Sequence, residues 1–361
     1  MNAAAPPVLP KAWLETALDP ARSLGPPAVC GRLRCQPEDF IVEEQLGFEA
    51  DGGSAHVLLR VEKTDANTLY VARALARQAG VRAADVGFAG LKDRRAVAVQ
   101  WFSVPAQRTE RDWAEFSGPG FRVLEALAHS RKLRRGALAG NRFRIRVREL
   151  TGDPASVAPR LDAIGSNGVP NYFGPQRFGR DATNLVAVAS WTEGARLPRD
   201  RDERGFLFSA ARSLAFNGVL AARVAAGSWN QLLDGEVVNL AGSGSVFHAE
   251  VIDDTLRSRC AVLDVHPSGP LPGVDGLRPT RAAADIEQVG LAPFAAVAAR
   301  LEQAGVEASR RALRVPVQDL GWALEGDELR VAFGLPRGAF ATTVLREIVD
   351  FGQEILPAGE D

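Results

Sequence analysis

The sequence predicts an α+β protein built from two domains, and three observations lead to this prediction. Residues 142–148 alternate strictly between cationic and apolar side chains, as a β-strand with one charged and one apolar face does. Residues 64–80 and 209–226 each carry apolar residues along one face, as amphipathic helices do. The chain of 361 residues is long for one domain, and from about Asn171 its texture changes to loop-rich Gly and Pro segments.

The composition is that of a soluble globular protein, with 46% hydrophobic and 24% charged residues. The first thirty residues contain six prolines and lack the basic start and apolar run of a secretory signal. No apolar stretch approaches the roughly 20 residues needed to cross a bilayer. We therefore expect a cytoplasmic protein that does not contact a membrane.

Motifs for metals, nucleotides and acyl chemistry are missing from the sequence. Cys30, Cys35 and Cys260 have neither a CxxC spacing nor neighbouring histidines, and the four histidines lack the spacing of metal ligands. There is no GxxxxGK(S/T) loop, no GxGxxG between a strand and a helix, and no GxSxG elbow. What remains is carboxylate chemistry, and we expect neither a metal nor a cofactor.

Helix and strand ends are marked by specific residues. The helix at 64–80 has Asp65 or Asn67 as its N-cap and Gly80 as its terminator. Further along, turn and periodicity signals place the last elements of the chain: a strand at 328–333, a turn at 335–338 and a helix at 341–351.

A polar turn with one aspartate follows the first helix. Residues 86–90 lead into this turn, and residues 96–104 are typical of an apolar strand that ends before Pro105. Asp93 lies in the turn among Lys92, Arg94 and Arg95, whose positive charge favours the ionised carboxylate. An ionised, oriented carboxylate can act as a nucleophile or base, but it can equally form surface ion pairs with its neighbours. Local sequence leaves both interpretations open.

The residues between 131 and 148 form the one strongly basic block of the chain. The net charge is -1, so affinity for a polyanion must come from segregated charge of this kind. The alternating half of the block has two interpretations. It is a solvated edge strand in which arginine discourages aggregation, or it is a face that binds phosphate.

Several motifs together resemble one protein family. Residues 87–94, with Ala96 and Gln100, resemble the signature of the tRNA pseudouridine synthase D family, in which the aspartate after the lysine is catalytic. Other parts of the chain resemble motifs of the same family and occur in the family's order: Pro37-Glu38-Asp39-Phe40, Lys132-Leu133-Arg134 with Gly136 and Gly140-Asn141, Asn171-Tyr172-Phe173-Gly174, Gln176-Arg177-Phe178-Gly179, and Gly338 with Phe340-Ala341-Thr342. Six motifs in register, over nearly the whole chain, are far more specific than one.

The resemblance implies a fold and a reaction. It implies a pseudouridine-synthase core with a mixed, largely antiparallel sheet at residues 1–167 and 316–361, interrupted by a family-specific α/β insertion domain at 168–315. It also implies transfer RNA as the partner and the uridine at position 13 as the usual target. Isomerising uridine to pseudouridine oxidises nothing and needs no energy input, which agrees with the absence of a cofactor loop.

The resemblance also assigns roles to residues. Asp93 falls on the catalytic aspartate, and Arg34 falls where the family carries a basic partner for it, usually lysine. Phe40, Asn141 and Phe340 fall on positions that contact the target uridine, and related synthases place an aromatic ring near Phe143. The segregated positive charge, and not the resemblance, leads us to expect contacts to the RNA backbone from five cationic residues: Lys92, Arg142, Arg144, Arg146 and Arg148.

Each of these residues has a structural alternative. Phe40 and Phe340 also suit a hydrophobic core, and Asn141 after Gly140 also suits a turn. Lys92 either binds phosphate or packs locally. At the level of the whole protein, the alternatives are a structured-RNA-binding protein without activity and an RNA enzyme of another type, such as a methyltransferase, which would need a cofactor loop. We expect a monomer.

Overall fold

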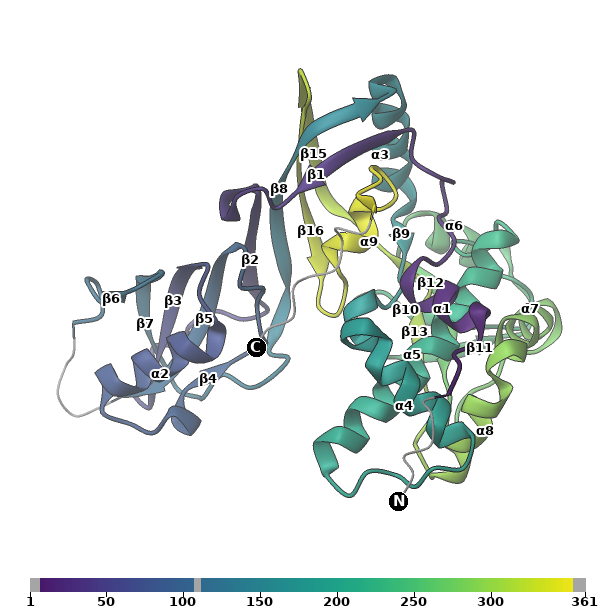
Figure 1. The fold of residues 1–361 in the computed structure, drawn as a ribbon, viewed down its shortest axis with the longest axis horizontal. Helices are drawn as coiled ribbons and strands as arrows, with labels where there is room; N and C mark the ends of the chain where they lie inside the picture. The colour runs from purple at the N-terminus through teal and green to yellow at the C-terminus, as the bar shows by residue number, and fades with distance from the viewer. Residues whose placement is uncertain (1–6, 107–111, 353–361) are drawn as a thin grey trace. The chain divides into compact units, whose positions relative to one another are not determined.

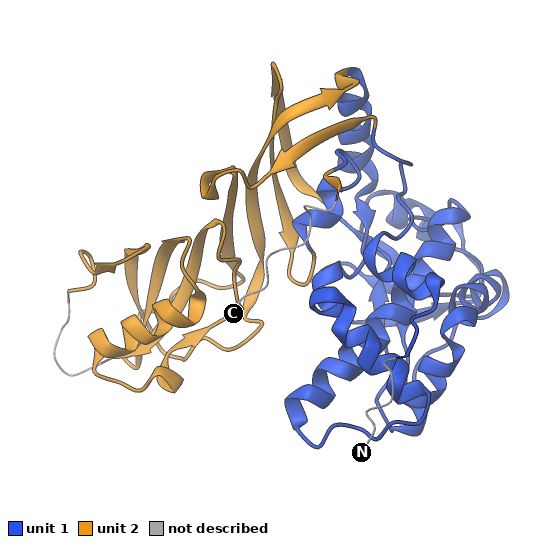
Figure 2. Cartoon of the chain, viewed as in Figure 1, with its two compact units in different colours: residues 1–27, 155–316, 340–350 blue, residues 28–154, 317–339, 351–361 orange. Residues whose placement is uncertain are grey.

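The structure is a computed structural model that describes residues 7–106 and 112–352, and the chain forms two compact units (Figures 1 and 2). Unit 1, blue in Figure 2, comprises residues 1–27, 155–316 and 340–350. Unit 2, orange, comprises residues 28–154, 317–339 and 351–361. Each unit has its own sheet and its own core, and each is described separately below.

Unit 2 is built on one ten-stranded sheet. The order is β15-β16-β8-β2-β5-β3-β7-β6, with β1 paired to β8 and β4 to β5. Only β2 and β5 run parallel among the described pairs of this sheet, so the predicted mixed, largely antiparallel sheet is confirmed. The strands are β1 (Val29–Leu33), β2 (Phe40–Leu46), β3 (His56–Thr64), β4 (Gly87–Phe88), β5 (Val97–Pro105), β6 (Ser117–Gly118), β7 (Phe121–His129), β8 (Leu138–Gly152), β15 (Gln318–Glu325) and β16 (Glu328–Pro336).

Strand register defines one continuous inner face of this sheet. Lys63 of β3 pairs with Ala98 of β5, which pairs with Val42 of β2. Val42 pairs with Phe143 of β8, and Phe143 with Phe333 of β16. Because paired residues point to the same side of a sheet, these five side chains form one row across it.

Helix α2 (Thr68–Ala79) covers part of this inner face. Its apolar residues join Leu59 and Val61 of β3 and Phe102 of β5 in one hydrophobic cluster. The Asn67 side chain caps the helix by accepting a hydrogen bond from the Leu69 N–H at 2.7 Å, and Gly80 ends it with φ 69°. The predicted helix and its terminator are confirmed, but the helix begins at Thr68 and not at residue 64, because Asn67 and not Asp65 is the cap.

The predicted strands are confirmed: two are longer than expected, and the third is shifted by one residue and includes Pro105. Residues 96–104 correspond to β5, residues 328–333 to β16, and residues 142–148 to the middle of β8. Strand β8 lies between β16 and β2, so the edge-strand interpretation of its arginines is wrong. Asn141 lies within β8, so the turn alternative for this residue is also wrong.

Unit 1 is a helical body around a four-stranded antiparallel sheet of order β11-β10-β12-β13. The strands of the unit are β9 (Val169–Pro170), β10 (Glu236–Leu240), β11 (Val246–Ala249), β12 (Val265–Leu271), β13 (Ser309–Ala312) and β14 (Arg314–Val315). The helices are α1 (Lys11–Leu18), α3 (Val157–Asn167), α4 (Thr183–Thr192), α5 (Arg201–Ala225), α6 (Asp254–Ala261), α7 (Arg281–Leu291), α8 (Ala295–Gln303) and α9 (Ala341–Leu345).

Helix α5 is the central helix of unit 1. It begins at Arg201, earlier than the predicted residue 209, because the Asp200 carboxylate accepts hydrogen bonds from the N–H groups of Asp202 and Glu203 at 2.9 Å. Its length and composition alone would allow it to span a membrane, but 61% of the apolar window is buried inside the protein. That burial is typical of a core helix.

The compact units do not divide the chain at the predicted domain boundaries. Residues 168–315 fall within unit 1, but this unit also contains α1, α3 and α9. Trp13 of α1 is buried in the core of unit 1, and Glu347 after α9 accepts hydrogen bonds from Ser23 and Leu24. These contacts hold α1 and the segment after α9 in unit 1. The division into 1–167 with 316–361 and 168–315 stays a prediction.

A buried histidine in unit 1 gives a prediction of pH dependence. Burial, and then the Arg314 guanidinium that contacts the His266 Nδ1 at 3.1 Å, lower the pKa of His266 to about 4. The folded state therefore favours the neutral ring, and stability is fully present above the unfolded pKa of about 6.5. As pH falls toward 4, protonation favours unfolding, with a loss of about 2 kcal/mol by pH 5.

Urea unfolding at pH 7.5 and pH 5.0 measures this loss. His266→Asn retains an acceptor near the position of Nδ1 and removes the titrating group, so we expect the variant to lose about 2 kcal/mol less than the wild type between the two values. Equal pH dependence of the two proteins would contradict the prediction.

Candidate active site

Asp93 lies in the connection between β4 and β5, as predicted, and its carboxylate is accessible. The side chain is 42% exposed, and its Oδ2 accepts a hydrogen bond from the Arg34 Nη2 at 2.6 Å. Within residues 7–106 and 112–352, Oδ1 has no hydrogen-bond partner. One oxygen is thus oriented by a cation while the other is free to meet a substrate atom.

Arg34 is held in an unusual backbone conformation directly after β1. Its φ is 60°, in the left-handed region, which costs a non-glycine residue of order 1 kcal/mol or more and is concentrated at functional sites. The guanidinium lies over the Phe40 ring, with Cζ 4.3 Å from the ring centroid. The contact to Asp93 is made by Nη2 alone, not by the two-pronged geometry that arginine allows. Arg34 therefore pairs with Asp93 as predicted and also covers the Phe40 ring.

Buried polar side chains hold the backbone of the connection between β4 and β5, residues 89–96, here called the Asp93 loop. The Lys63 ammonium, completely buried, donates hydrogen bonds to the carbonyls of Lys92 at 3.2 Å and Asp93 at 2.9 Å. The Gln100 Nε2 donates to the Gly90 carbonyl at 2.6 Å, and the Thr68 hydroxyl accepts from the Lys92 N–H at 3.2 Å. Three side chains from β3, β5 and α2 thus fix the loop, and fixed geometry of this kind is what a catalytic group requires.

Lys92 has a carboxylate partner inside the protein. Its Nζ lies 2.6 Å from the Glu44 Oε1, and the two side chains are 10% and 0% exposed. The other Glu44 oxygen accepts a hydrogen bond from the Trp101 N–H at 2.9 Å. This buried ion pair favours local packing over phosphate binding as the role of Lys92.

Aromatic rings and one amide form the inner face beside the Asp93 loop. Phe40 and Phe143 meet edge to face with centroids 6.0 Å apart, and Phe143 contacts Phe333 at 5.5 Å. Asn141 lies two residues before Phe143 on β8 and pairs with Glu44 of β2. Its Oδ1 is buried and has no hydrogen-bond partner in the described part of the chain. A buried acceptor without a partner suits a ligand that donates a hydrogen bond.

The four predicted arginines of β8 point to the other face of the sheet. Side chains alternate along a strand, so they lie opposite to Asn141 and Phe143. Three of them have carboxylate partners: Arg142 with Asp319 at 3.0 Å, Arg146 with Glu328 at 3.3 Å, and Arg148 with Asp39 at 2.8 Å. Carboxylates of the protein itself therefore neutralise three of the four arginines.

Arg144 differs from the other three arginines. It is exposed, and no carboxylate of the described residues forms an ion pair with it. It lines a groove of about 380 Å³ together with Ile41, Arg146, Trp322 and Arg330. Of the predicted cationic strand, Arg144 is the residue whose charge remains available to a ligand.

Phe340 and two of the six motifs lie in unit 1. Phe340 precedes α9 and packs, partly buried, against the core of this unit, so its predicted contact with uridine stays a prediction. The motif that begins at Asn171 has a structural role, because the Phe173 N–H donates to the Asn217 Oδ1 at 2.9 Å. Arg311 stacks on Phe173, with Cζ 4.2 Å from the ring centroid.

Glu44, Lys63 and Thr68 also contact the Asp93 loop, although no motif in the sequence pointed to them. Strand periodicity contained the signal for two of them. Glu44 follows Phe40 and Val42 on the buried positions of β2, and Lys63 follows Leu59 and Val61 in the same way on β3. A charged residue at a buried position of a strand needs a specific partner, and both partners are in the Asp93 loop.

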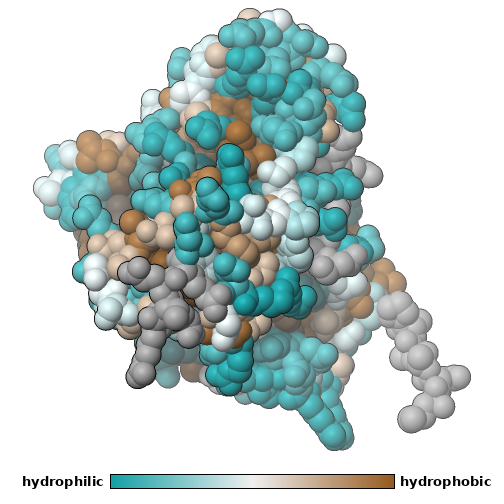
Figure 3. Space-filling model, turned by 90° about the vertical axis from the view of Figure 1, so that its left-hand side faces the viewer, coloured by the Kyte–Doolittle hydropathy of each residue, from teal (hydrophilic) through white to brown (hydrophobic). Residues whose placement is uncertain are grey.

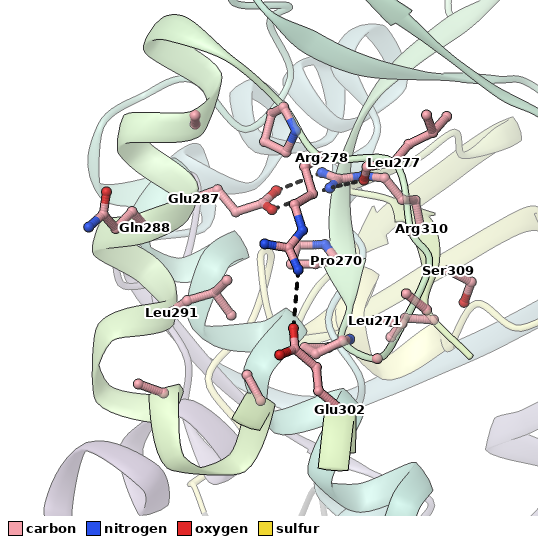
Figure 4. A pocket seen from close by; sticks show the side chains of 18 of the residues that line it. Pro270, Leu271, Leu277, Arg278, Glu287, Gln288, Leu291, Glu302, Ser309 and Arg310 are labelled. Carbon is pink, nitrogen blue, oxygen red and sulfur yellow. Dashed lines mark hydrogen bonds and ion pairs between the residues drawn. The ribbon is translucent and has the colours of Figure 1, made fainter. Parts of the chain in front are cut away.

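A cavity in unit 1 offers little chemistry by comparison. It has a volume of about 630 Å³ and lies between β12, α7 and α8 (Figure 4). Its charged side chains neutralise one another, since Arg310 contacts Glu287 at 2.6 Å and Arg278 contacts Glu302 at 3.3 Å. None of the predicted site residues is among those that line it. Size alone does not make it the functional site.

Exposed hydrophobic side chains are scattered over the protein. On the face drawn in Figure 3, hydrophobic atoms gather in small areas between hydrophilic ones. Leu91 is one such residue in the Asp93 loop, with 49% of its surface exposed. Single exposed residues of this kind are normal on folded proteins and need no partner.

Comparisons with known proteins converge on one family. The family profile described as tRNA pseudouridine synthase D matches residues 23–191 and 200–348. A tRNA pseudouridine synthase D of Nitrosococcus oceani is 48% identical over 328 residues, covering 90% of this chain and 92% of the relative. That of Methylococcus capsulatus is 45% identical over 341 residues, covering 94% and 96%. A solved structure from Methanosarcina mazei, provisionally given the same name, has a TM-score of 0.73 at 22% identity and covers 94% of this chain and 98% of its own.

Proposed function

The chain belongs to the tRNA pseudouridine synthase D family, and we propose that it converts the uridine at position 13 of transfer RNA to pseudouridine with Asp93 as the catalytic carboxylate. As a pseudouridine synthase it is an isomerase that acts on uridine in tRNA. The observation that carries the role of Asp93 is an accessible carboxylate with one oxygen paired to Arg34, on a loop held by buried polar groups.

The reaction determines what this carboxylate must do. The bond from ribose C1′ to uracil N1 breaks, the ring turns, and a bond forms from C1′ to C5. The proton on C5 leaves and N1 gains one, so the product is an isomer and no electrons are exchanged with a cofactor. Asp93 can assist by attacking C1′ or by removing a proton, and the unpartnered Oδ1 supports either role.

The target nucleotide must leave its stack to reach Asp93, which costs a few kcal/mol. We propose that Phe40 and Phe143 receive the extruded uracil and that Asn141 recognises its edge. The unpartnered Asn141 Oδ1 is an acceptor for the N3–H of uracil, a pairing that cytosine cannot offer. Phe340 is proposed as a further contact to the base by family resemblance.

We expect the RNA backbone to contact those cationic side chains that no carboxylate of the protein neutralises. Among the predicted residues, Arg144 is proposed as a phosphate ligand because no described carboxylate neutralises it. Arg142, Arg146, Arg148 and Lys92 are proposed only as secondary contacts, since each already has a carboxylate partner. A phosphate would have to compete with these partners.

We also propose a monomeric, cytoplasmic enzyme. Asp93, Arg34, Phe40, Asn141 and Phe143 all come from one chain, so the site needs no second copy to bring these five together. The thiols of Cys30, Cys35 and Cys260 are free, which suits a reducing compartment.

Mapping the product on tRNA tests the function. Unmodified tRNA transcripts with uridine at position 13 are incubated with the wild-type protein, and pseudouridine is located by sequencing. We expect one pseudouridine at position 13, and none in a matched transcript with cytidine there. Pseudouridine only at other positions would overturn the proposed site, and its absence from all tRNAs tested would overturn the activity.

A further inference from the structure

A basic loop between β7 and β8 is fixed directly against the Asp93 loop. The Gly136 N–H donates a hydrogen bond to the Ala89 carbonyl at 2.7 Å, and Ala89 lies four residues before Asp93. The Leu133 N–H donates to the Ser103 hydroxyl of β5 at 2.8 Å. The approach is so close that a Cβ added at Gly87 would lie 2.3 Å from the Leu133 carbonyl oxygen. The loop at residues 131–136, here called the basic loop, thus has a fixed backbone.

The cationic side chains of the basic loop are exposed and not neutralised. Arg131, Lys132, Arg134 and Arg135 all lie at the surface, and no carboxylate within residues 7–106 and 112–352 forms an ion pair with any of them. The Lys132 Nζ is bound by a neutral group, the Ala84 carbonyl, at 2.6 Å. The basic loop therefore keeps its positive charge, whereas Arg142, Arg146 and Arg148 of β8 are neutralised by Asp319, Glu328 and Asp39.

One of these side chains is already oriented for an anion. The Arg135 guanidinium stacks on the Phe88 ring, with Cζ 3.9 Å from the centroid. Stacking uses the face of the guanidinium and leaves its N–H groups at the edge, where a phosphate binds. Arg337 extends the same patch, because its Nη1 donates to the Gly136 carbonyl at 3.3 Å.

We propose that the basic loop is the main phosphate-binding site for the RNA strand that flanks the target nucleotide, with Arg131 and Arg134 as direct ligands. The β8 arginines are on the opposite face of the sheet from Asn141 and Phe143, whereas the basic loop is hydrogen-bonded to the segment that carries Asp93. The inference rests on the proposed function, because it requires RNA as the substrate. Phosphate contacts position a nucleic acid without reading its sequence, which suits extruding one nucleotide into a fixed site.

The salt dependence of tRNA binding tests this proposal. Arg131→Ala/Arg134→Ala is compared with the matched control Arg122→Ala/Arg259→Ala, which removes the same number of charges from two surface arginines that already have carboxylate partners, Glu62 and Asp264. We expect the loop variant to raise the Kd at least about tenfold at low salt and to reduce the slope of log K against log salt by about two, one for each lost phosphate contact. The control should change the Kd by less than about threefold, since side chains that contact no phosphate release no counterions on binding.

Two further measurements distinguish a loss of RNA binding from a loss of catalysis, and the role of charge from that of the arginine side chain itself. At saturating tRNA, the loop variant should form pseudouridine within about twofold of the wild-type rate, as expected when only binding is lost. Arg131→Lys/Arg134→Lys keeps the charge and should keep most of the salt slope. A wild-type slope for the alanine loop variant, or an equal loss in the control, would overturn the proposal. If the wild type binds tRNA but forms no pseudouridine, the proposed function fails while the binding site still stands.

Discussion

Asp93→Asn is expected to lower the rate of pseudouridine formation at least about 10⁴-fold, the scale of losing a nucleophile or base that acts on the substrate itself. Asparagine keeps the shape of the side chain and removes the charge that either step requires. Nucleoside analysis of tRNA incubated with excess enzyme measures the loss. The free Oδ1 and the 42% exposure of Asp93 are the observations behind the expected size of the effect.

Folding and RNA binding should survive this substitution. The ion pair with Arg34 has one partly exposed partner, and such pairs contribute about 1 kcal/mol or less. The Asp93 carbonyl still accepts the hydrogen bond from Lys63. Thermal unfolding and the Kd for tRNA are therefore the controls. A rate that falls only in proportion to lost binding would assign Asp93 to substrate binding and not to chemistry.

Glu44→Gln is expected to destabilise the protein by about 3–5 kcal/mol, the cost of breaking a buried ion pair and leaving one charge behind. The Gln side-chain oxygen can still accept from the Trp101 N–H, so the change isolates the pairing with Lys92. The Asp93 loop should lose its fixed geometry as well, and we expect pseudouridine formation to slow even where the protein is folded. Urea unfolding and single-turnover rates measure the two effects.

A double-mutant cycle separates the ion pair from other contacts of the two residues. Glu44→Gln/Lys92→Met removes both charges, and its loss of stability should be smaller than the sum of the two single losses by 2 kcal/mol or more, since neither charge is then left unpaired. The Lys92 backbone contacts with Thr68 and Lys63 persist in each variant. Additive losses would mean that the two side chains do not stabilise each other.

Local sequence predicted the elements better than their arrangement. The strand at residues 142–148 and the cap of α2 depend on neighbouring residues; the sequence predicted the strand and limited the cap to Asp65 or Asn67. The position of β8 between β16 and β2 depends on residues far along the chain, because β16 begins at Glu328. Periodicity within one strand cannot reveal which strands flank it, so the edge-strand interpretation could not be excluded.

The pairing of Asp93 with Arg34 could be predicted from the sequence, whereas the partners of the β8 arginines could not. Asp93 and its pairing with Arg34 followed from family resemblance, and the geometry brings the two together. The carboxylate partners of the β8 arginines, such as Asp319, come from segments far away in the sequence. A run of arginines therefore looked more available to phosphate than it is. Whether an arginine is available to bind phosphate depends on its neighbours in the fold and not only on its neighbours in the sequence.

Tritium release from tRNA that carries tritium at C5 of uridine tests the role of Asp93 at the reacting atom, because forming the C1′–C5 bond expels that hydrogen. Enzyme is used in excess over tRNA so that binding is complete for each protein. We expect the wild type to release tritium in step with the pseudouridine formed, and Asp93→Asn, bound to the same tRNA, to release none above the enzyme-free background. Release by Asp93→Asn at the wild-type rate would show that another group carries the reaction.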